Sequence, residues 1–161
     1  MEDLRMQTVS LFFHIVGVGL MFCGIIAVPI VESMFRTALD TRSAHTLHKV
    51  ISRLGLLTPI ASGLLLISGI ANIITAQLVV FREGWLILKL VFFIIMLLIG
   101  ILQGISYRKR GRLVEAIALG NAPESTPTET KMLTRKLATF GRIQTSLLVL
   151  ILLLTLFRPY L

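Results

Sequence analysis

The stretch EGWLILKLVFFIIMLLIG, residues 83–100, decides the fold of this chain. An apolar run of about 20 residues has the length that a helix needs to cross the hydrocarbon core of a bilayer. The stretch therefore predicts a membrane-spanning helix. One basic side chain, Lys89, lies inside it, and the next charged residue is Arg108. A lysine near the bilayer centre costs about 2.5–3.5 kcal/mol on insertion scales, so Lys89 calls for a structural or functional reason.

Three further apolar runs accompany this stretch. Of the 161 residues, 55% are hydrophobic and the mean hydropathy is +0.89, which is more apolar than soluble domains are. Exposed strand edges are not tolerated in lipid, so we expect one all-α domain, an integral membrane antiparallel four-helix bundle. The expected spans are about 9–30, 54–74, 85–106 and 138–157, and the expected longer loops are about 31–53 and 107–137.

Basic residues are distributed unevenly between the two ends of these spans. By the positive-inside rule, the side that holds most of them is cytoplasmic. Both termini are then expected on the outer side of a cytoplasmic (inner) membrane. We attribute the net charge of +8 to this topology and to an attraction to anionic headgroups. We therefore expect no nucleic-acid partner. The loop side and its junctions hold Arg36, Arg42, Lys49, Arg53, Arg108, Lys109, Arg110, Arg112, Lys131, Arg135, Lys136 and Arg142, against Arg5, Arg82 and Arg158 on the other.

Two features near the N-terminus refine this view. The start MEDLR carries two acidic residues, and no small-residue cleavage site follows the first apolar run. We therefore expect a retained helix rather than a secretory signal. The only cysteine, Cys23, lies within that run, which excludes an internal disulfide and predicts a free, buried thiol.

The second longer loop is expected to contain helix. The segment YRKRGRLVEAIALGN can extend the third span into water and stop at Gly120-Asn121. Thr126 and Glu129 form a capping-box pattern with Pro127 at the first helical position, which predicts the start of the helix that leads into the fourth span.

His14 and Lys89 are the candidate site residues within the membrane. Each follows the start of its span by a few residues, and the two spans run in the same direction. At about 1.5 Å per residue, both lie roughly 6–8 Å into the outer leaflet. Lys89 either extends along its helix to the headgroups or serves a site. His14 either bonds to a neighbouring helix or contributes to that same site.

A neutral imidazole is a good ligand for haem iron or a transition metal, and Lys89 could orient an anionic group beside it. A second axial ligand would come from Lys89, from Met21 or Met96, from water, or from His14 of another subunit. Met21 and Met96 each follow a candidate residue by seven positions and share its helix face. They are therefore possible supporting residues.

The remaining histidines, His45 and His48, lie three residues apart on a possible interfacial helix. Two histidines without a neighbouring carboxylate or thiol make a weak metal signal, so we expect a solvated basic face. No serine–histidine–acid set, phosphate loop or acid pair within a span is present, so hydrolase and nucleotide chemistry find no support.

The order of motifs resembles the HemJ-type protoporphyrinogen oxidases and their CopD-like relatives, a family of four-helix membrane proteins. The resemblance covers residues 10–105. The matching positions are His14, Gly24 and Pro29 in the first span, Arg53, Leu54, Pro59 and Gly69 in the second, and Trp85, Leu86, Lys89 and Leu90 in the third. Three positions depart from that family's pattern, namely Met21, Ile30 and Ile87.

The resemblance implies a bacterial membrane protein with a b-type haem or similar redox cofactor near the outer leaflet. His14 would be the iron ligand and Lys89 its neighbour, in electron transfer or porphyrinogen oxidation. Arg53 and Arg142 are expected to anchor headgroups, and Arg53 is also a possible supporting residue of the site. One alternative is a non-catalytic accessory or scaffold subunit of a homo-oligomer or larger membrane complex. Another is copper handling through His14, Met21 and Cys23.

Overall fold

The computed structural model describes residues 2–37, 40–76 and 84–157, without the side chains of residues 2–4 and 41. Arg82 and Arg158, which the topology prediction used, lie outside the described residues. The described part is all helical, and no strand occurs in it. The helices are α1 (Glu2–Thr37), α2 (Thr41–Leu54), α3 (Leu57–Thr75), α4 (Gly84–Ala118) and α5 (Thr126–Leu156).

Within the described residues, four helical segments are long and apolar enough to cross a membrane, the second of these candidates being α2 and α3 taken together. The predicted all-α, four-helix membrane bundle is therefore confirmed. The helix α2 differs in character, because its sequence TRSAHTLHKVISRL is strongly amphipathic. Its charged residues are costly in hydrocarbon, so we expect α2 to extend the bundle beyond the hydrocarbon core, where it packs against α1 and α4.

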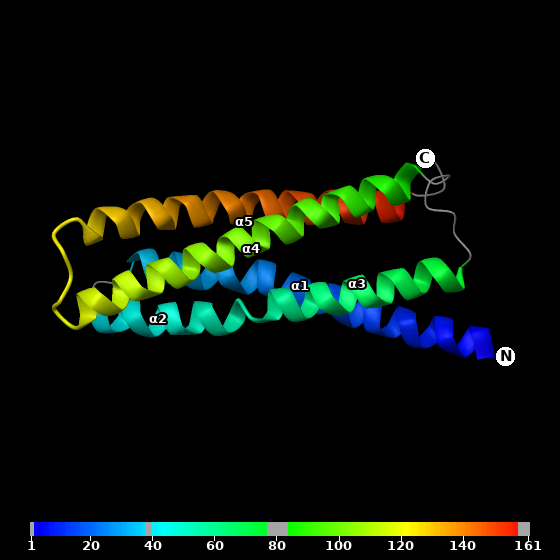
Figure 1. Cartoon of the computed structure of the whole chain (residues 1–161), viewed down its shortest axis with the longest axis horizontal. Coiled ribbons are helices and arrows are strands. Elements are labelled where there is room, and N and C mark those ends of the chain that lie inside the picture. The colour runs from blue at the N-terminus through cyan, green and yellow to red at the C-terminus, as the bar shows by residue number, and fades with distance from the viewer. Residues whose placement is uncertain (1, 38–39, 77–83, 158–161) are drawn as a thin grey trace.

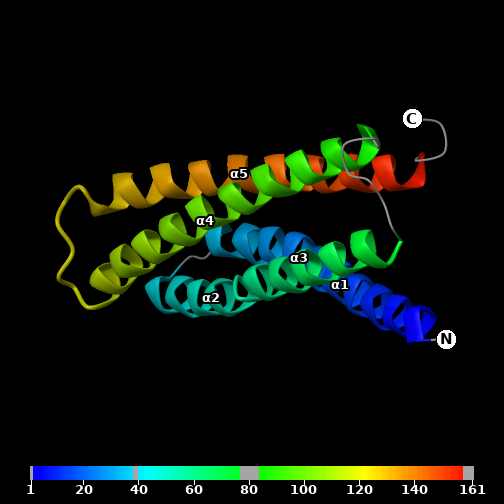
Figure 2. The same ribbon diagram turned by 45° about the vertical axis from the view of Figure 1, so that its right-hand side comes forward.

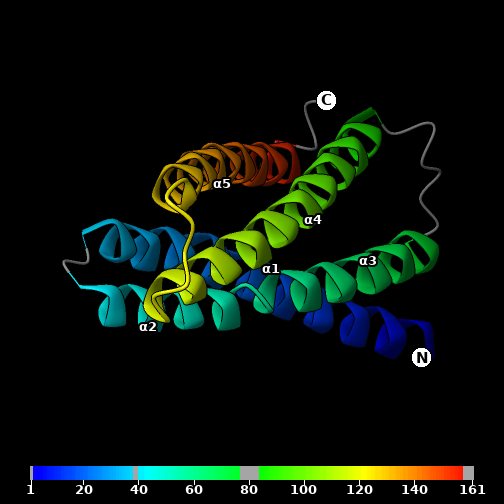
Figure 3. The ribbon, with the colours of Figure 1, turned by 60° about the vertical axis from the view of Figure 1, so that its left-hand side comes forward.

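The four spans are arranged as two antiparallel pairs. The helix α1 packs along α3, and α4 packs along α5, whereas direct contact between the two pairs is sparse (Figure 1). A rotated view separates the two pairs more clearly (Figure 2). At one end α2 contacts both α1 and α4 and so bridges the pairs (Figure 3). We call this end, with α2, the last part of α4 and the first part of α5, the basic end.

The start of α1 and the last turns of α5 lie together at the opposite end, which we call the terminal end (Figure 1). An even number of spans requires this arrangement. Near the middle of the bundle, one buried apolar cluster contains residues from both pairs. We call it the apolar layer; its members are Met21, Ala61, Met96, Leu147 and Leu148.

The predicted loops are shorter than expected because the helices continue through them. The helix α1 runs on to Thr37, and most of residues 41–53 form α2. The break between α2 and α3 falls at Gly55 and Leu56. Pro59 favours a break here, because proline lacks the N–H that would bond to the carbonyl of Gly55 and its ring collides with that carbonyl in a continuous helix. Pro29, by contrast, is accommodated inside α1.

The connection between α4 and α5 agrees with the prediction in outline and differs at the cap. Gly120 has a φ of 73°, a conformation that favours glycine, and follows the end of α4. The N-cap of α5 is Ser125 rather than Thr126, and it makes no side-chain capping bond. Glu129 instead pairs with Lys109 of α4 at 2.6 Å, so its carboxylate joins the two helices.

Two predictions about burial were wrong. Cys23 is exposed, because an apolar position on a membrane helix can face lipid as well as protein. His48 was expected on a solvated face, yet only 7% of it is exposed. The reason is the packing of α2 against α4, which covers the face of α2 that carries this ring.

Candidate functional site

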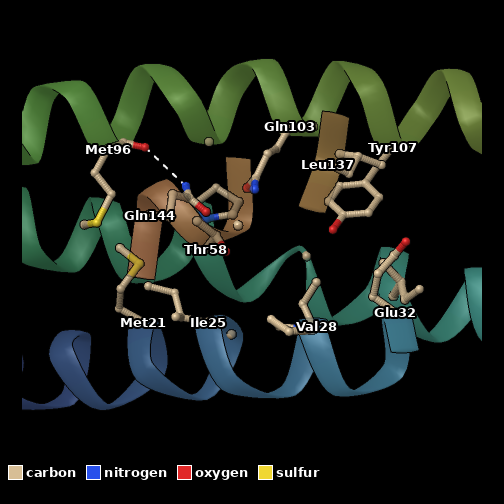
Figure 4. A pocket seen from close by; sticks show the side chains of 18 of the residues that line it. Met21, Ile25, Val28, Glu32, Thr58, Met96, Gln103, Tyr107, Leu137 and Gln144 are labelled. Atoms are coloured by element: carbon tan, nitrogen blue, oxygen red, sulfur yellow. Dashed lines mark hydrogen bonds between the residues drawn. The ribbon is translucent and has the colours of Figure 1, made fainter. Parts of the chain in front are cut away.

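A cavity of about 1310 Å³ lies between the two helix pairs and receives residues from all five helices. It extends from the apolar layer, where Met21 and Met96 line it, to Glu32 and Tyr107 at the basic end (Figure 4). Eleven residues separate Met21 from Glu32, and eleven separate Met96 from Tyr107. At the rise of an α-helix, both separations give a length of ~16 Å.

Small and polar side chains line the middle of this cavity. An added Cβ at Gly63, Gly104 or Gly141 would meet nothing within 4 Å, so glycine leaves space there. Gln144 is 6% exposed and donates from Nε2 to the carbonyl of Met96 at 3.3 Å. The cavity is thus mainly apolar with a few polar groups, which is the composition of ligand sites.

A buried ion pair joins the two helix pairs at the basic end. Arg110 of α4 is fully buried, and its two terminal nitrogens donate to the two carboxylate oxygens of Glu32 on α1, at 2.5 and 2.9 Å. Bidentate pairing of this kind is the strongest that arginine and carboxylate form. Arg110 also donates to Thr134 Oγ1 of α5 at 3.4 Å, so one side chain contacts three helices.

Aromatic rings enclose the guanidinium of Arg110. Its central carbon lies 4.4 Å from the ring centroid of Phe35 and 5.2 Å from that of Tyr107. Such stacking stabilises a desolvated cation. The Nε atom of Arg110 is buried and finds no hydrogen-bond partner among the described residues. The cluster of Glu32, Phe35, Tyr107 and Arg110, which we call the ionic cluster, bounds the cavity at this end.

His48 of α2 packs beside this cluster. An added Cβ at Gly111 would lie 2.5 Å from His48 Nε2, which shows how closely α2 approaches α4. His48 Nε2 is also 3.5 Å from Ser52 Oγ. Burial, and next the positive charge of Arg110, lowers the pKa of His48 to about 4. The imidazole is therefore neutral at physiological pH.

Four arginines line the cavity, and all four are exposed; Arg142, two residues before Gln144, lies nearer the middle than the other three. They come from α1, α2, α4 and α5, and they are Arg36, Arg53, Arg108 and Arg142. Of the described residues in the lining, only Glu32 carries a carboxylate, and both of its oxygens accept hydrogen bonds from Arg110. Positive charge therefore predominates where the cavity meets the basic end, which we call the cavity mouth.

His14 lies in the terminal half, where its Nδ1 is 3.0 Å from Ser68 Oγ of α3. The Ser68 hydroxyl donates its single proton to the carbonyl of Leu64, so it can only accept from His14. This assigns the proton to Nδ1 and leaves a lone pair on Nε2. Lys89 donates to Thr155 Oγ1 of α5 at 3.1 Å, and its charge acts on the His14 ring.

The sequence from residue 8 to residue 159 matches a family described as predicted integral membrane protein. The chain belongs to this DUF2269 family. No curated protein and no solved structure matches the chain. The likeness of this DUF2269 chain to HemJ-type oxidases and CopD-like proteins stays a prediction.

The predicted site residues of this DUF2269 chain fall in two places. Met21 and Met96 share the apolar layer and line the cavity, as does Arg53. His14 and Lys89 are not in its lining. The copper residues do not converge, because His14 packs on α3, Met21 is buried and Cys23 is exposed. Among the described residues, no three His, Cys, Asp or Glu side chains group around a possible metal.

Sequence reasoning missed the ionic cluster. One signal was present, because Glu32 is the only carboxylate between Asp3 and Asp40 and follows directly on an apolar run. A lone acid at that depth needs a cationic partner. The sequence YRKRGR offers four candidates in α4, and the sequence alone does not select Arg110 among them.

Proposed function

We propose that this protein binds an amphipathic small molecule from the bilayer in the cavity between its two helix pairs. The cavity's position and volume carry this proposal. Ligand pockets are typically about 300–1,000 Å³, and this one, at about 1310 Å³, has room for a large lipid-like molecule. It lies between pairs that contact each other sparsely, so a ligand can enter sideways from lipid.

The composition of the lining supports an amphipathic occupant rather than a purely apolar one. Near the apolar layer the walls are Met, Ile and Leu side chains, and near the basic end they carry exposed arginines. Gln144, Gln103 and Thr58 lie between these zones (Figure 4). A molecule with an apolar chain and a polar head matches this gradient along its length.

Filling the cavity tests the proposal. Native mass spectrometry of the delipidated protein, titrated with a lipid extract, should show adducts of one amphiphile per chain. Gly141→Leu should abolish these adducts, because the new side chain enters the cavity from a position where an added Cβ meets nothing within 4 Å. Gly19→Leu is the matched control, since it has the same open surroundings and does not line the cavity. Adducts that remain unchanged in the Gly141→Leu variant would show that the amphiphile binds outside the cavity.

A second candidate is a b-type haem held by His14, and the proton on its Nδ1 favours it. A histidine that binds metal usually donates its other ring N–H to a fixed acceptor, and Ser68 is that acceptor here. His14 therefore fits as one axial ligand. A bound haem would supply one-electron transfer. No second histidine, among those described, lies in the same half of the bundle.

A reduced-minus-oxidised absorption spectrum of the purified protein tests this candidate. Soret and α-bands that disappear in His14→Ala and remain in His45→Ala would establish the ligand. The control residue lies on α2 at the other end of the bundle. A featureless spectrum from folded protein, produced with ample haem, would contradict the haem candidate and leave the cavity proposal intact.

A further inference from the structure

The charge around the cavity mouth selects among amphipathic ligands. Arg53, Arg108 and Arg142 form no ion pair with a carboxylate in the described part of the chain. Arg36 approaches Glu32 only at 4.0 Å, and that carboxylate is bound by Arg110. The mouth therefore presents more positive charge than its own acidic groups balance. An anionic head is the complement of this surface.

A smaller pocket of about 340 Å³ continues the basic surface between α2 and α4. It shares Ser52 and Arg108 with the main cavity, so the two adjoin. Its other basic residues are His45, Lys49 and Arg112, with Glu115 as its single acid among the described residues. Guanidinium groups pair with phosphate oxygens in a fork geometry. A phosphate group offers more acceptor oxygens than a carboxylate, so it can pair with more of these basic side chains at once.

The depth of the cavity fits one leaflet. From the apolar layer to the ionic cluster it extends ~16 Å along the helices, and half of a hydrocarbon core is about 15 Å. With His14 roughly 6–8 Å below the outer surface, the apolar layer lies near the midplane. The cavity then occupies the leaflet at the basic end and opens at the level of its headgroups.

We infer that the cavity is a site for an anionic phospholipid of the leaflet at the basic end. Its phosphate contacts Arg36, Arg53 and Arg108 at the basic end, and its acyl chain extends past Gln144 to Met21 and Met96. Basic pockets between helices on the cytoplasmic side are suited to such headgroups. This inference rests on the proposed function and adds the class of ligand to it.

Headgroup selectivity tests the inference on the full chain in mild detergent. Delipidated protein is titrated with phosphatidylglycerol and with phosphatidylcholine of the same acyl chains, and bound lipid is counted by native mass spectrometry. The double variant R53Q/R108Q should lower the affinity for phosphatidylglycerol by roughly 25-fold, since each arginine near an anionic headgroup contributes roughly fivefold. The matched control K131Q/R135Q removes two exposed charges of α5 that do not line the cavity.

The outcomes separate the inference from the proposed function. Preference for phosphatidylglycerol that R53Q/R108Q abolishes and K131Q/R135Q retains supports the inference. Equal binding of both lipids, blocked by Gly141→Leu, overturns it and leaves an amphiphile site. Stronger binding of an isoprenoid diphosphate than of either lipid also overturns the phospholipid assignment. Failure of every lipid to bind, with Gly141→Leu equal to wild type, refutes both.

Discussion

The two ends of the bundle use polar side chains in different ways. At the basic end, Glu32 and Arg110 connect one helix pair to the other through two buried hydrogen bonds. In the terminal half, His14 bonds to Ser68 within one pair, and Lys89 bonds to Thr155 within the other. Among the described residues, a buried ion pair joins the pairs at the basic end, and the apolar layer joins them in the middle.

The charged residues at the two ends therefore have different roles, although each is costly to remove from water. An ion pair buried in protein is weak evidence for stability, because desolvation offsets much of the attraction. Breaking it by removing one partner is nevertheless expensive. The ionic cluster thus acts mainly to specify which faces of the two pairs meet. Lys89, one helix turn from its span's start, instead donates to a hydroxyl at an exposed position.

Glu32→Gln should have the largest effect among the single substitutions that compare the two ends. The change leaves the guanidinium of Arg110 buried without a carboxylate, which typically costs about 3–5 kcal/mol. Thermal unfolding in detergent, followed by circular dichroism, measures the loss. Lys89→Met is the matched change in the terminal half, and it should cost far less. Equal losses for the two variants would erase the distinction between the two ends.

Gly111→Ala should have the next largest effect. The new Cβ would lie 2.5 Å from His48 Nε2, so either the buried ring or the two helices must move, and overpacking of this kind costs about 1–3 kcal/mol. Gly104→Ala, on the same helix, meets nothing within 4 Å and should gain up to about 1 kcal/mol from helix propensity. A stabilised Gly111→Ala protein would show that α2 does not pack tightly at the basic end.

Acidification should weaken the basic end through His48, to a smaller extent. The pKa of His48 is about 4 in the folded protein against 6.5 for the free side chain. Between these values the unfolded chain binds more protons than the folded one. The contribution of neutral His48 to the free energy of unfolding is therefore fully present above pH 6.5 and is lost as the pH decreases toward 4. The melting temperature at pH 7 and at pH 5 measures this slope. His48→Gln should flatten the slope, whereas His45→Gln should keep it.

Ser68→Ala should have the smallest effect. It removes the acceptor of His14 within one helix pair, and hydrogen bonds of this kind in membranes average about 0.6 kcal/mol. Its melting temperature should stay close to that of wild type. A loss as large as that of Glu32→Gln would show that the terminal half, too, depends on a polar cross-link.

Most of the fold follows from hydrophobic length and charge distribution. Each span is set by an uninterrupted apolar run, and lipid leaves the backbone no choice but a helix. The helical extensions beyond the spans were only partly foreseen. Local polarity does not show where α1 ends, and proline is no certain stop either, because Glu2–Thr37 continues through Pro29.

The cavity and the ionic cluster were much less predictable. Both depend on the rotation of each helix about its axis, which decides that Arg110 is buried while its neighbours Arg108 and Lys109 are exposed. Amino-acid composition alone does not show which of these basic residues is buried. The burial of His48 has the same origin, since it requires α2 to lie against Gly111. The candidate pair His14 and Lys89 was easier to identify because each is conspicuous in its own apolar run.

The length of the helices makes the basic end sensitive to the thickness of the membrane. The helix α4 has 35 residues, or ~52 Å at the rise of an α-helix, against a hydrocarbon core of about 30 Å. The surplus places Arg110 and Glu32 at the boundary between headgroups and hydrocarbon. A thicker bilayer covers that boundary and a thinner one exposes it to water. The same ion pair is then more strongly coupled in one membrane than in another, so lipid composition itself sets how firmly the two helix pairs are joined.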